Sequence, residues 1–389
     1  MGSPRLVDPD LDFIRELKRA GGDTLKRCYQ CATCSTTCNL SNDDSPFPRK
    51  EMLMASWGQS EDLMKDPDVW LCYQCNDCSI RCPRGARPGD VLAAVRSAAY
   101  KRFAFPSFMG RALASPRALP WLLLVPALVM TALIFLTAPR TASGAFEFAQ
   151  SNIIDFNTFL PHQTVDAFFV AGNILIFILA AVGFVRFWRL LRTDSAPRKM
   201  SVGQAVVLTL KEIFAHTNFR KCDTNRARNI GHLLLFFGFL GGMVTTGAVL
   251  VLIFLPHYME AIGLGAPHAL FELPLTVANP IKILGILSGL ALAAGCGMLL
   301  YRRWTKKEEV GASGYTDTLF LYILFFTGLT GLTSWLGRLT GVAAIAYANY
   351  FVHILCVYFL LWYMPYSKFA HMFYRGLAIV HARTLGRVT

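Results

Sequence analysis

Long apolar stretches and short polar connections alternate along residues 106–389, whereas residues 1–105 are charged and rich in cysteine. A helix needs about 20 apolar residues to cross a bilayer. Six stretches meet this length, at residues 119–138, 165–190, 230–255, 280–301, 318–339 and 346–364. The pattern predicts an all-α protein, with a small helical domain over residues 1–105 and a six-helix membrane domain over residues 106–389. With 54% apolar and only 16% charged residues, a soluble protein with one core is excluded.

Positive charge is distributed unequally between the connections. Residues 137–164 contain only Arg140, and residues 256–279 contain neither Lys nor Arg. The second and fourth connections, by contrast, hold Arg186, Arg189, Arg192, Arg198, Lys199, Lys211, Arg220, Lys221, Arg226, Arg228, Arg302, Arg303, Lys306 and Lys307. Basic connections stay in the cytoplasm. We therefore expect a multi-pass protein of the inner (cytoplasmic) membrane with residues 1–105 and both termini in the cytoplasm. This asymmetry explains most of the net charge of +13, and nothing beyond charge supports nucleic-acid binding.

Eight of the eleven cysteines form two copies of the pattern CxxCxxCxxxC. The first three cysteines of such a motif ligate one cubane cluster, whereas the fourth ligates the other cluster. We therefore predict two [4Fe–4S] clusters with crossed ligands. The first would be held by Cys28, Cys31, Cys34 and Cys82, and the second by Cys72, Cys75, Cys78 and Cys38. Structural zinc on the same thiolates is the alternative, although zinc sites usually pair two CxxC units across a longer loop.

Three histidines near the predicted spans are candidate heme ligands, because imidazoles at membrane depth are costly without a partner or a metal. His353 and His371 are eighteen residues apart, which is five turns and a rise of about 27 Å, so they would lie on one face near opposite membrane surfaces if the last helix continued past Pro365. His232 begins the third span at its cytoplasmic end, level with His371. The two histidines could hold an inner heme b. Interfacial histidines bonded to headgroups or carbonyls are the alternative reading.

An outer heme would need a partner for His353. His162 is the first choice, ahead of His257 and His268, since it begins the second span. His216, in the basic segment before the third span, is a candidate contact for a quinone headgroup, although such a residue is more often simply on the surface. No nucleophile or acid–base constellation is evident, so we expect no catalytic residue in the N-terminal domain.

The motifs CYQCATCSTTCN, CYQCNDCSIRCPRGARPGD and PFPRKEM resemble the C subunits of the quinone-interacting membrane-bound oxidoreductase complexes of sulfate reducers. The phrases HLLLFFGF and WYMPYSKFAHMFYR extend the resemblance into the membrane domain. Such chains are fusions, similar to the iron–sulfur and cytochrome b subunits of heterodisulfide reductase. The membrane part is also similar to the gamma subunit of respiratory nitrate reductase, where four histidines hold two hemes. Three of these match His232, His353 and His371, whereas the fourth falls on Gly242, which implies a replacement ligand for the outer heme.

The resemblance implies an oxidoreductase subunit that exchanges electrons with menaquinone. Two b hemes and both clusters would connect the quinone with two heterodisulfide-reductase-A-like flavoprotein subunits and, finally, with adenylylsulfate reductase. Two alternatives stay open. The chain could be the heme b and iron–sulfur subunit of a respiratory heterodisulfide reductase-type complex, or a membrane anchor whose metal sites serve assembly only.

Overall fold

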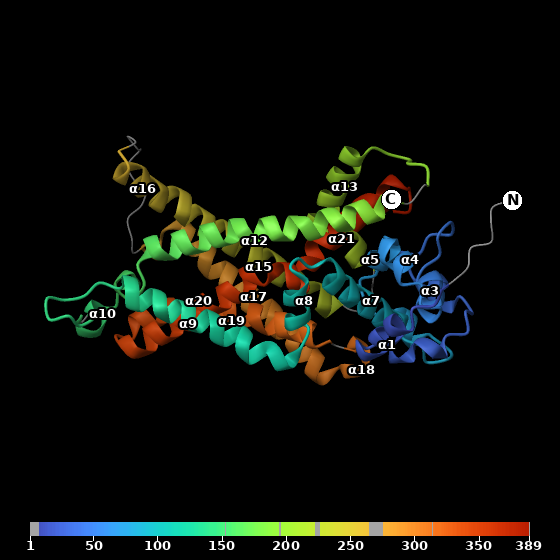
Figure 1. Ribbon diagram of the computed structural model, residues 1–389, viewed down its shortest axis with the longest axis horizontal. Coiled ribbons are helices and arrows are strands. Elements are labelled where there is room, and N and C mark those ends of the chain that lie inside the picture. Colours follow the sequence, from blue (N-terminus) through green and yellow to red (C-terminus); the bar gives the residue numbers. More distant parts are fainter. Residues whose placement is uncertain are drawn as a thin grey trace.

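The computed structural model describes residues 8–151, 153–193, 196–221, 226–263, 275–312 and 314–388. Across these ranges the regular elements are helices, and the only β-bridges are two isolated ones. The all-α prediction is confirmed. The molecule is elongated, with the cysteine-rich helices at one end and the loop that carries α10 (Glu147–Gln150) at the other (Figure 1).

Short helices make up the cysteine-rich end. They are α1 (Leu11–Arg19), η1 (Asp23–Arg27), α2 (Thr33–Thr37), α3 (Arg49–Ser56), α4 (Ser60–Lys65), α5 (Asp68–Leu71), α6 (Asp77–Ile80) and α7 (Pro88–Phe103). The longest of them, α7, begins at a proline whose missing N–H would have no helical partner there in any case. It packs against α1, α3 and α6, and these short helices are therefore arranged around it.

Six helices in the described ranges are long and apolar enough to cross a membrane. They are α9 (Leu119–Thr137, extended by η2, Pro116–Ala118), α12 (His162–Leu191), α15 (Arg226–Val249, continued by η4, Leu250–Phe254, and α16, Leu255–Ala261), α17 (Pro280–Thr305), α19 (Tyr315–Leu339) and α20 (Ala343–Trp362). The six predicted spans are thereby confirmed by length and composition, and they indicate a multi-pass membrane protein. Shorter helices connect them: α8 (Ser107–Leu113), α11 (Phe156–Phe159), α13 (Val202–Ala215), α14 (Thr217–Arg220) and α18 (Lys307–Val310).

Glycines set the close packing of α15 against α17. A Cβ on Gly238 would lie 2.5 Å from the backbone nitrogen of Leu292, and one on Gly295 would lie 2.5 Å from that of Leu235. Neither position can carry a side chain without moving the helices apart. Small residues on membrane helices allow this kind of backbone contact. The glycines that follow His232 therefore mainly serve helix packing, although Gly242 has open space beside it.

The last span does not continue past Pro365. Helix α20 ends at Trp362, two short 3₁₀ turns follow, η5 (Met364–Tyr366) and η6 (Lys368–Ala370), and α21 (His371–Thr384) then begins. Proline lacks an N–H and disfavours a helical conformation at the preceding residue, which explains the break. The condition that would place His353 and His371 on one continuous helical face is therefore not met.

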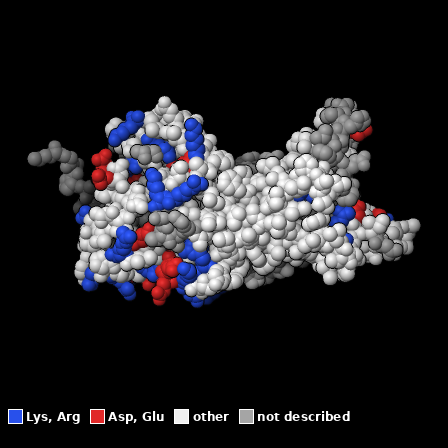
Figure 2. Space-filling view, turned by 180° about the vertical axis from the view of Figure 1, so that it is seen from behind, with Lys and Arg blue, Asp and Glu red and all other residues white. Residues whose placement is uncertain are grey.

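The hydrophobic core of the cysteine-rich end extends into the membrane domain. Buried Trp70 of α5 stacks on Tyr374 of α21 and contacts the ring of Phe187 of α12 edge-on. The same core includes Leu17 and Val95 from α1 and α7. Figure 2 shows Lys and Arg gathered at this end, beside a broad uncharged band over the membrane helices. The two predicted domains thus share one interface core.

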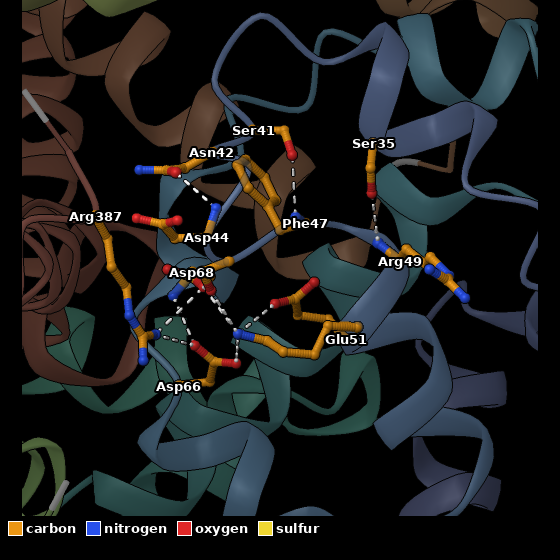
Figure 3. Close-up of polar contacts among 12 residues, drawn as sticks. Ser35, Ser41, Asn42, Asp44, Phe47, Arg49, Glu51, Asp66, Asp68 and Arg387 are labelled. Carbon is orange, nitrogen blue, oxygen red and sulfur yellow. Dashed lines mark hydrogen bonds and ion pairs between the residues drawn. The ribbon is translucent and has the colours of Figure 1, made fainter. Parts of the chain in front are cut away.

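A buried charge network fastens the C-terminal segment to this end (Figure 3). The ammonium of Lys50 lies 2.9 Å from Asp66, 2.9 Å from Asp68 and 3.3 Å from Glu51. Arg387 also pairs with Asp66 at 3.2 Å and with Asp68 at 3.3 Å. The three carboxylates are almost fully buried. Their spacing would suit a metal ion, but the Lys50 ammonium already occupies the position among them.

Candidate functional site

Both cysteine motifs adopt the same unusual backbone. Gln30 and Ala32 in the first motif have φ of 59° and 68°, and Gln74 and Asn76 in the second have φ of 54° and 74°. Left-handed conformations are costly for residues other than glycine and persist where the surroundings fix them. Alternating conformations of this kind turn successive N–H groups toward one point, a geometry common around iron–sulfur clusters. The internal repeat seen in the sequence is thus also a repeat of backbone structure.

The structure brings the fourth cysteine of the first motif to the second motif. Helices α2 and α6, one from each motif, pack against each other. Burial, with the neighbouring Cys72 and Cys75 thiolates, raises the pKa of Cys38 to about 12. Burial and the same two thiolates, together with Cys38, raise the pKa of Cys78 as well. Cys38 thus lies among the other three proposed ligands of the second cluster, as crossed ligation requires. Iron binding there must displace thiol protons.

Each motif has a hydrogen bond to its first sulfur. The Gln74 backbone N–H donates to Cys72 Sγ at 3.2 Å, and the Gln30 side-chain amide donates to Cys28 Sγ at 3.3 Å. Cys34 is buried near Cys28, and burial raises its pKa to about 11. Cys31 is exposed, whereas Cys82 is half-buried against the core. The assignment of all eight cysteines to two clusters stays a prediction.

Two arginines of the membrane domain hold the second motif. Arg228 of α15 donates to the carbonyls of Gln74, at 2.7 Å, and of Tyr73. Arg375 of α21 donates to the carbonyls of Leu71, at 3.1 Å, and Cys72, at 3.2 Å. The Arg375 guanidinium also lies 3.7 Å above the Tyr73 ring. Sequence reasoning explained Arg228 by membrane topology alone, because a charge pattern does not show which carbonyls a side chain will contact.

Behind the second motif, α13 and α21 are joined by a buried ion pair. The Tyr73 hydroxyl donates to Glu212 of α13 at 2.8 Å, and Arg383 of α21 pairs with the same carboxylate. Glu212 and Arg383 are 6% and 4% exposed, so the pair is largely removed from water. A buried pair of this kind fixes the orientation of the elements that carry it.

One cavity of about 790 Å³ lies between this motif and the membrane helices. Its lining includes His232, His371 and His216, together with Cys72 and Tyr73 of the second cysteine motif. Its volume is in the range of sites that bury sizeable ligands. His232 and His371, predicted as partners, are therefore brought to the same cavity, and that cavity directly adjoins a proposed cluster ligand.

Two histidines in the cavity have a ring nitrogen that could bind a metal. In His371 a hydrogen bond at one nitrogen leaves the other available, and in His232 a buried nitrogen has no hydrogen-bond partner among the described residues. His371 Nδ1–H donates to the Lys368 carbonyl at 2.5 Å, which leaves Nε2 free to bind a metal. Burial, and then the charge of Lys368, lower the pKa of His371 to about 4, so its ring is neutral near pH 7. His232 Nδ1 is buried without a hydrogen-bond partner among the described residues. The His216 ring centroid lies 5.3 Å from that of His232.

The proposed ligands of the outer heme have separate surroundings. His353 Nδ1 lies 3.1 Å from the Thr330 hydroxyl, and its ring faces Gly331. His353 comes ten residues after the first residue of α20, which is Ala343 (353 − 343 = 10), and thus about 15 Å along the helix. This position is near the middle of α20 and not at either of its ends.

His162 and His257 lie at the other end of the membrane domain from the cysteines. The His162 ring stacks on Phe254 at 4.7 Å, and His257 Nδ1–H donates to the Ile253 carbonyl at 2.6 Å. His268 lies outside the described residues. Among the described contacts, none joins either ring to His353. Ligation of an outer heme therefore stays a prediction.

Sequence reasoning missed an ion pair in the cavity wall. Lys368 and Asp317 lie 2.9 Å apart, and both belong to the cavity lining with Arg303. A carboxylate in the first turn of a membrane helix was the available signal, since an intramembrane acid usually has a named partner.

Comparison with known proteins covers both parts of the chain. Residues 24–86 match the family described as "4Fe-4S dicluster domain". Residues 111–389 match the family described as "Citrate utilization protein B". The chain belongs to the citrate utilization protein B family. Citrate utilization protein B of Escherichia coli is 28% identical over 329 residues, which are 80% of each chain. No solved structure matches the chain.

Other relatives match the cysteine-rich part of this family member. A subunit of the H(2):CoB-CoM heterodisulfide,ferredoxin reductase of Methanothermobacter marburgensis is 36% identical over 93 residues, which are 24% of this chain. The iron-sulfur subunit of the CoB--CoM heterodisulfide reductase of Methanopyrus kandleri is 33% identical over 106 residues, or 25% of this chain. The chain spans about half the length of these relatives, 50% and 55%. The N-terminal part is an iron–sulfur domain of the 4Fe–4S dicluster type, and these relatives are subunits of oxidoreductase complexes.

Proposed function

We propose that this chain transfers electrons between a membrane quinone and soluble flavoprotein partners, through heme b in the cavity and two [4Fe–4S] clusters. The observation that supports this most is the shared cavity, in which His232 and His371 line the same space as Cys72. A redox group there would be next to a cluster ligand. The quinone would be menaquinone, and the ultimate soluble partner adenylylsulfate reductase, reached through two heterodisulfide-reductase-A-like flavoprotein subunits.

The cavity residues fit a heme. His371 presents a neutral ring with its Nδ1–H already engaged, and His232 has a buried nitrogen without a partner among the described residues. Arg228 lines the same cavity and can neutralise a carboxylate of a bound group. A heme with two imidazole ligands supplies one-electron transfer, with no position left for a substrate.

The quinone would approach along α13. The residues of this helix that face away from α21 are apolar and exposed, with Val207 at 52%, Leu210 at 49% and Phe214 at 51%. Leu210 and Phe214 also line the cavity, as does His216, which caps the helix. A lipid-soluble ring could thus pass from the bilayer to the cavity, with the His216 imidazole as its polar contact. The proposed orientation puts this portal at the cytoplasmic membrane surface.

A second candidate function is that of a heme b and iron–sulfur subunit in a respiratory heterodisulfide reductase-type complex. The heterodisulfide reductase relatives support it over the N-terminal, cysteine-rich part of the chain. It differs in the soluble substrate, because electrons would go to or from a thiol–disulfide couple. Oxidation of the reduced chain by a heterodisulfide, in the presence of its soluble partners, would favour this candidate over adenylylsulfate reductase.

Heme content after mutation tests the proposal. The pyridine hemochrome assay on purified protein should give two hemes for the wild type and one for His232→Ala, with the second heme removed by His353→Ala. His162→Ala and His257→Ala are tested in the same way. The variant that also loses that heme identifies the partner of His353. A wild-type protein without any b-type heme would refute the proposal and leave a membrane anchor as the explanation.

A further inference from the structure

The two proposed cluster sites differ in what covers them. The second motif is covered by the membrane domain, since Arg228 and Arg375 donate to its backbone carbonyls. On another side, the Asn76 side-chain amide donates to the Glu309 carbonyl at 3.1 Å, in α18. A soluble protein cannot reach this motif without displacing these contacts.

The first motif is more open, although the side-chain amide of its last residue, Asn39, donates to the Lys221 carbonyl at 2.9 Å. Cys31 is exposed, and the neighbouring Tyr29 is 67% exposed. In Figure 1, α3, which begins at Arg49, lies at the end of the molecule farthest from α10 and α16. The first motif adjoins α3, since the Arg49 N–H donates to the hydroxyl of Ser35 in α2 at 3.3 Å, and it therefore lies at this end of the molecule, where a soluble protein could bind.

Three exposed arginines surround the open motif. The Arg84 guanidinium lies 4.0 Å above the Tyr29 ring and donates to its hydroxyl at 2.9 Å. Arg27 lies beside the next residue, Gly85, with its Nη1 3.7 Å from the position of a Cβ there. Arg49 is close enough to Cys31 for its charge to act on the thiol. We call Arg27, Tyr29, Arg49 and Arg84 the exit ring.

The cations of the exit ring have no acidic partner within the described residues. None of Arg27, Arg49 and Arg84 forms an ion pair there, whereas Arg383 and Arg387 are paired with carboxylates. Unpaired exposed cations around an exposed aromatic side chain are typical of a surface that recognises an acidic partner. The distance from the membrane helices argues against anionic lipid as that partner.

We propose that the exit ring is the docking surface for an acidic, soluble redox protein, so that electrons pass between this partner and the membrane domain by way of the cluster of the first motif and the cluster of the second. This inference rests on the proposed electron-transfer function and adds the place at which the soluble partner binds. Each transfer moves one electron from a reduced [4Fe–4S] cluster to the oxidised partner, and no bond is made or broken.

The test uses the full-length protein in proteoliposomes, reduced chemically with dithionite and freed of excess reductant, so that it does not depend on quinone chemistry. The oxidant is flavodoxin, an acidic FMN protein that takes one electron from each reduced cluster. The rate at which flavodoxin oxidises the clusters should fall steeply as the salt concentration rises, because salt screens exposed charges. In the double variant Arg49→Glu and Arg84→Glu, the rate at low salt should be lower by about tenfold or more.

A matched double variant on α1, Arg15→Glu and Lys18→Glu, makes the same change in net charge outside the exit ring and should react as the wild type does. Cationic tris(phenanthroline)cobalt(III) should show the inverse pattern, with faster oxidation of the exit-ring variant. Electron paramagnetic resonance confirms that both clusters remain, and the milder Arg84→Gln replaces the double variant if they do not. Equal rates for both double variants, or a wild-type rate that does not change with salt, would overturn the proposal. Failure of menaquinol to reduce the clusters would instead refute the proposed function.

Discussion

Arg375 is the side chain through which the histidine-bearing segment holds the second cysteine motif. It lies four residues after His371, so the two side chains share one face of α21. Its guanidinium donates to the carbonyls of Leu71 and Cys72 and covers the ring of Tyr73. We predict that Arg375→Ala loosens the motif from the cavity while the heme remains bound.

The expected loss can be worked from these contacts. Each hydrogen bond from a charged donor contributes about 1.5–3 kcal/mol, and the stacking on Tyr73 contributes about 0.5–2 kcal/mol. Because the site is only partly buried, roughly 3 kcal/mol in total is a reasonable figure, or about a hundredfold in the docking equilibrium. Arg375→Lys keeps the charge but not the planar fork, so its loss should be smaller.

The assay follows heme and clusters separately after mixing with a menaquinol analogue. In Arg375→Ala, heme reduction should keep its rate and cluster reduction should slow by about tenfold or more, since the motif is displaced from the cavity for most of the time. Arg189→Ala, which removes an exposed arginine from the last turn of α12, is the matched control and should change neither rate. Fast cluster reduction in Arg375→Ala, with an unchanged melting temperature, would show that these contacts do not position the motif.

Three further predictions concern the cysteine-rich end. Lys50→Met removes the ammonium from among three buried carboxylates and should cost about 3 kcal/mol of unfolding free energy, seen as early loss of cluster absorbance on heating; Lys26→Met, on the surface, should have no such effect. Burial, with Asp66 nearby, raises the pKa of Glu51 from 4.5 to about 8, so the folded state binds more protons than the unfolded one between these values. Stability should therefore fall as the pH rises through that window. The melting temperature of Glu51→Gln should change less with pH over the same window. Cys82→Ser should damage the cluster of Cys28, Cys31 and Cys34 and spare the other; loss of the second cluster's resonance would contradict crossed ligation.

The helices follow directly from the sequence because apolar length and turn-forming residues act locally. The six spans form where the pattern predicts them. The break at Pro365 is also local and could have been expected from the missing N–H. The sequence cannot show that the stretch Met364–Ala370 turns the chain so that His371 meets His232 across a cavity.

Interactions between distant segments account for what the sequence left open. Basic residues such as Arg228 and Arg383 indicate a membrane side, but their partners, Tyr73 and Glu212, are far away in the chain. In the same way, the glycines after His232 could have admitted a porphyrin or a helix, and only the position of α17 decides for the helix. The cysteine pattern was more informative because its spacing itself restricts the geometry.

Pre-steady-state reduction by a menaquinol analogue tests the proposed electron route most directly. The full-length protein in proteoliposomes is mixed anaerobically with the quinol, and heme absorbance and the resonances of both clusters are followed in rapidly frozen samples. We predict that the heme is reduced first and the clusters afterwards, and that His371→Ala removes the signal of the inner heme and abolishes cluster reduction although the clusters are present. Clusters that are reduced at the wild-type rate in His371→Ala would contradict this route.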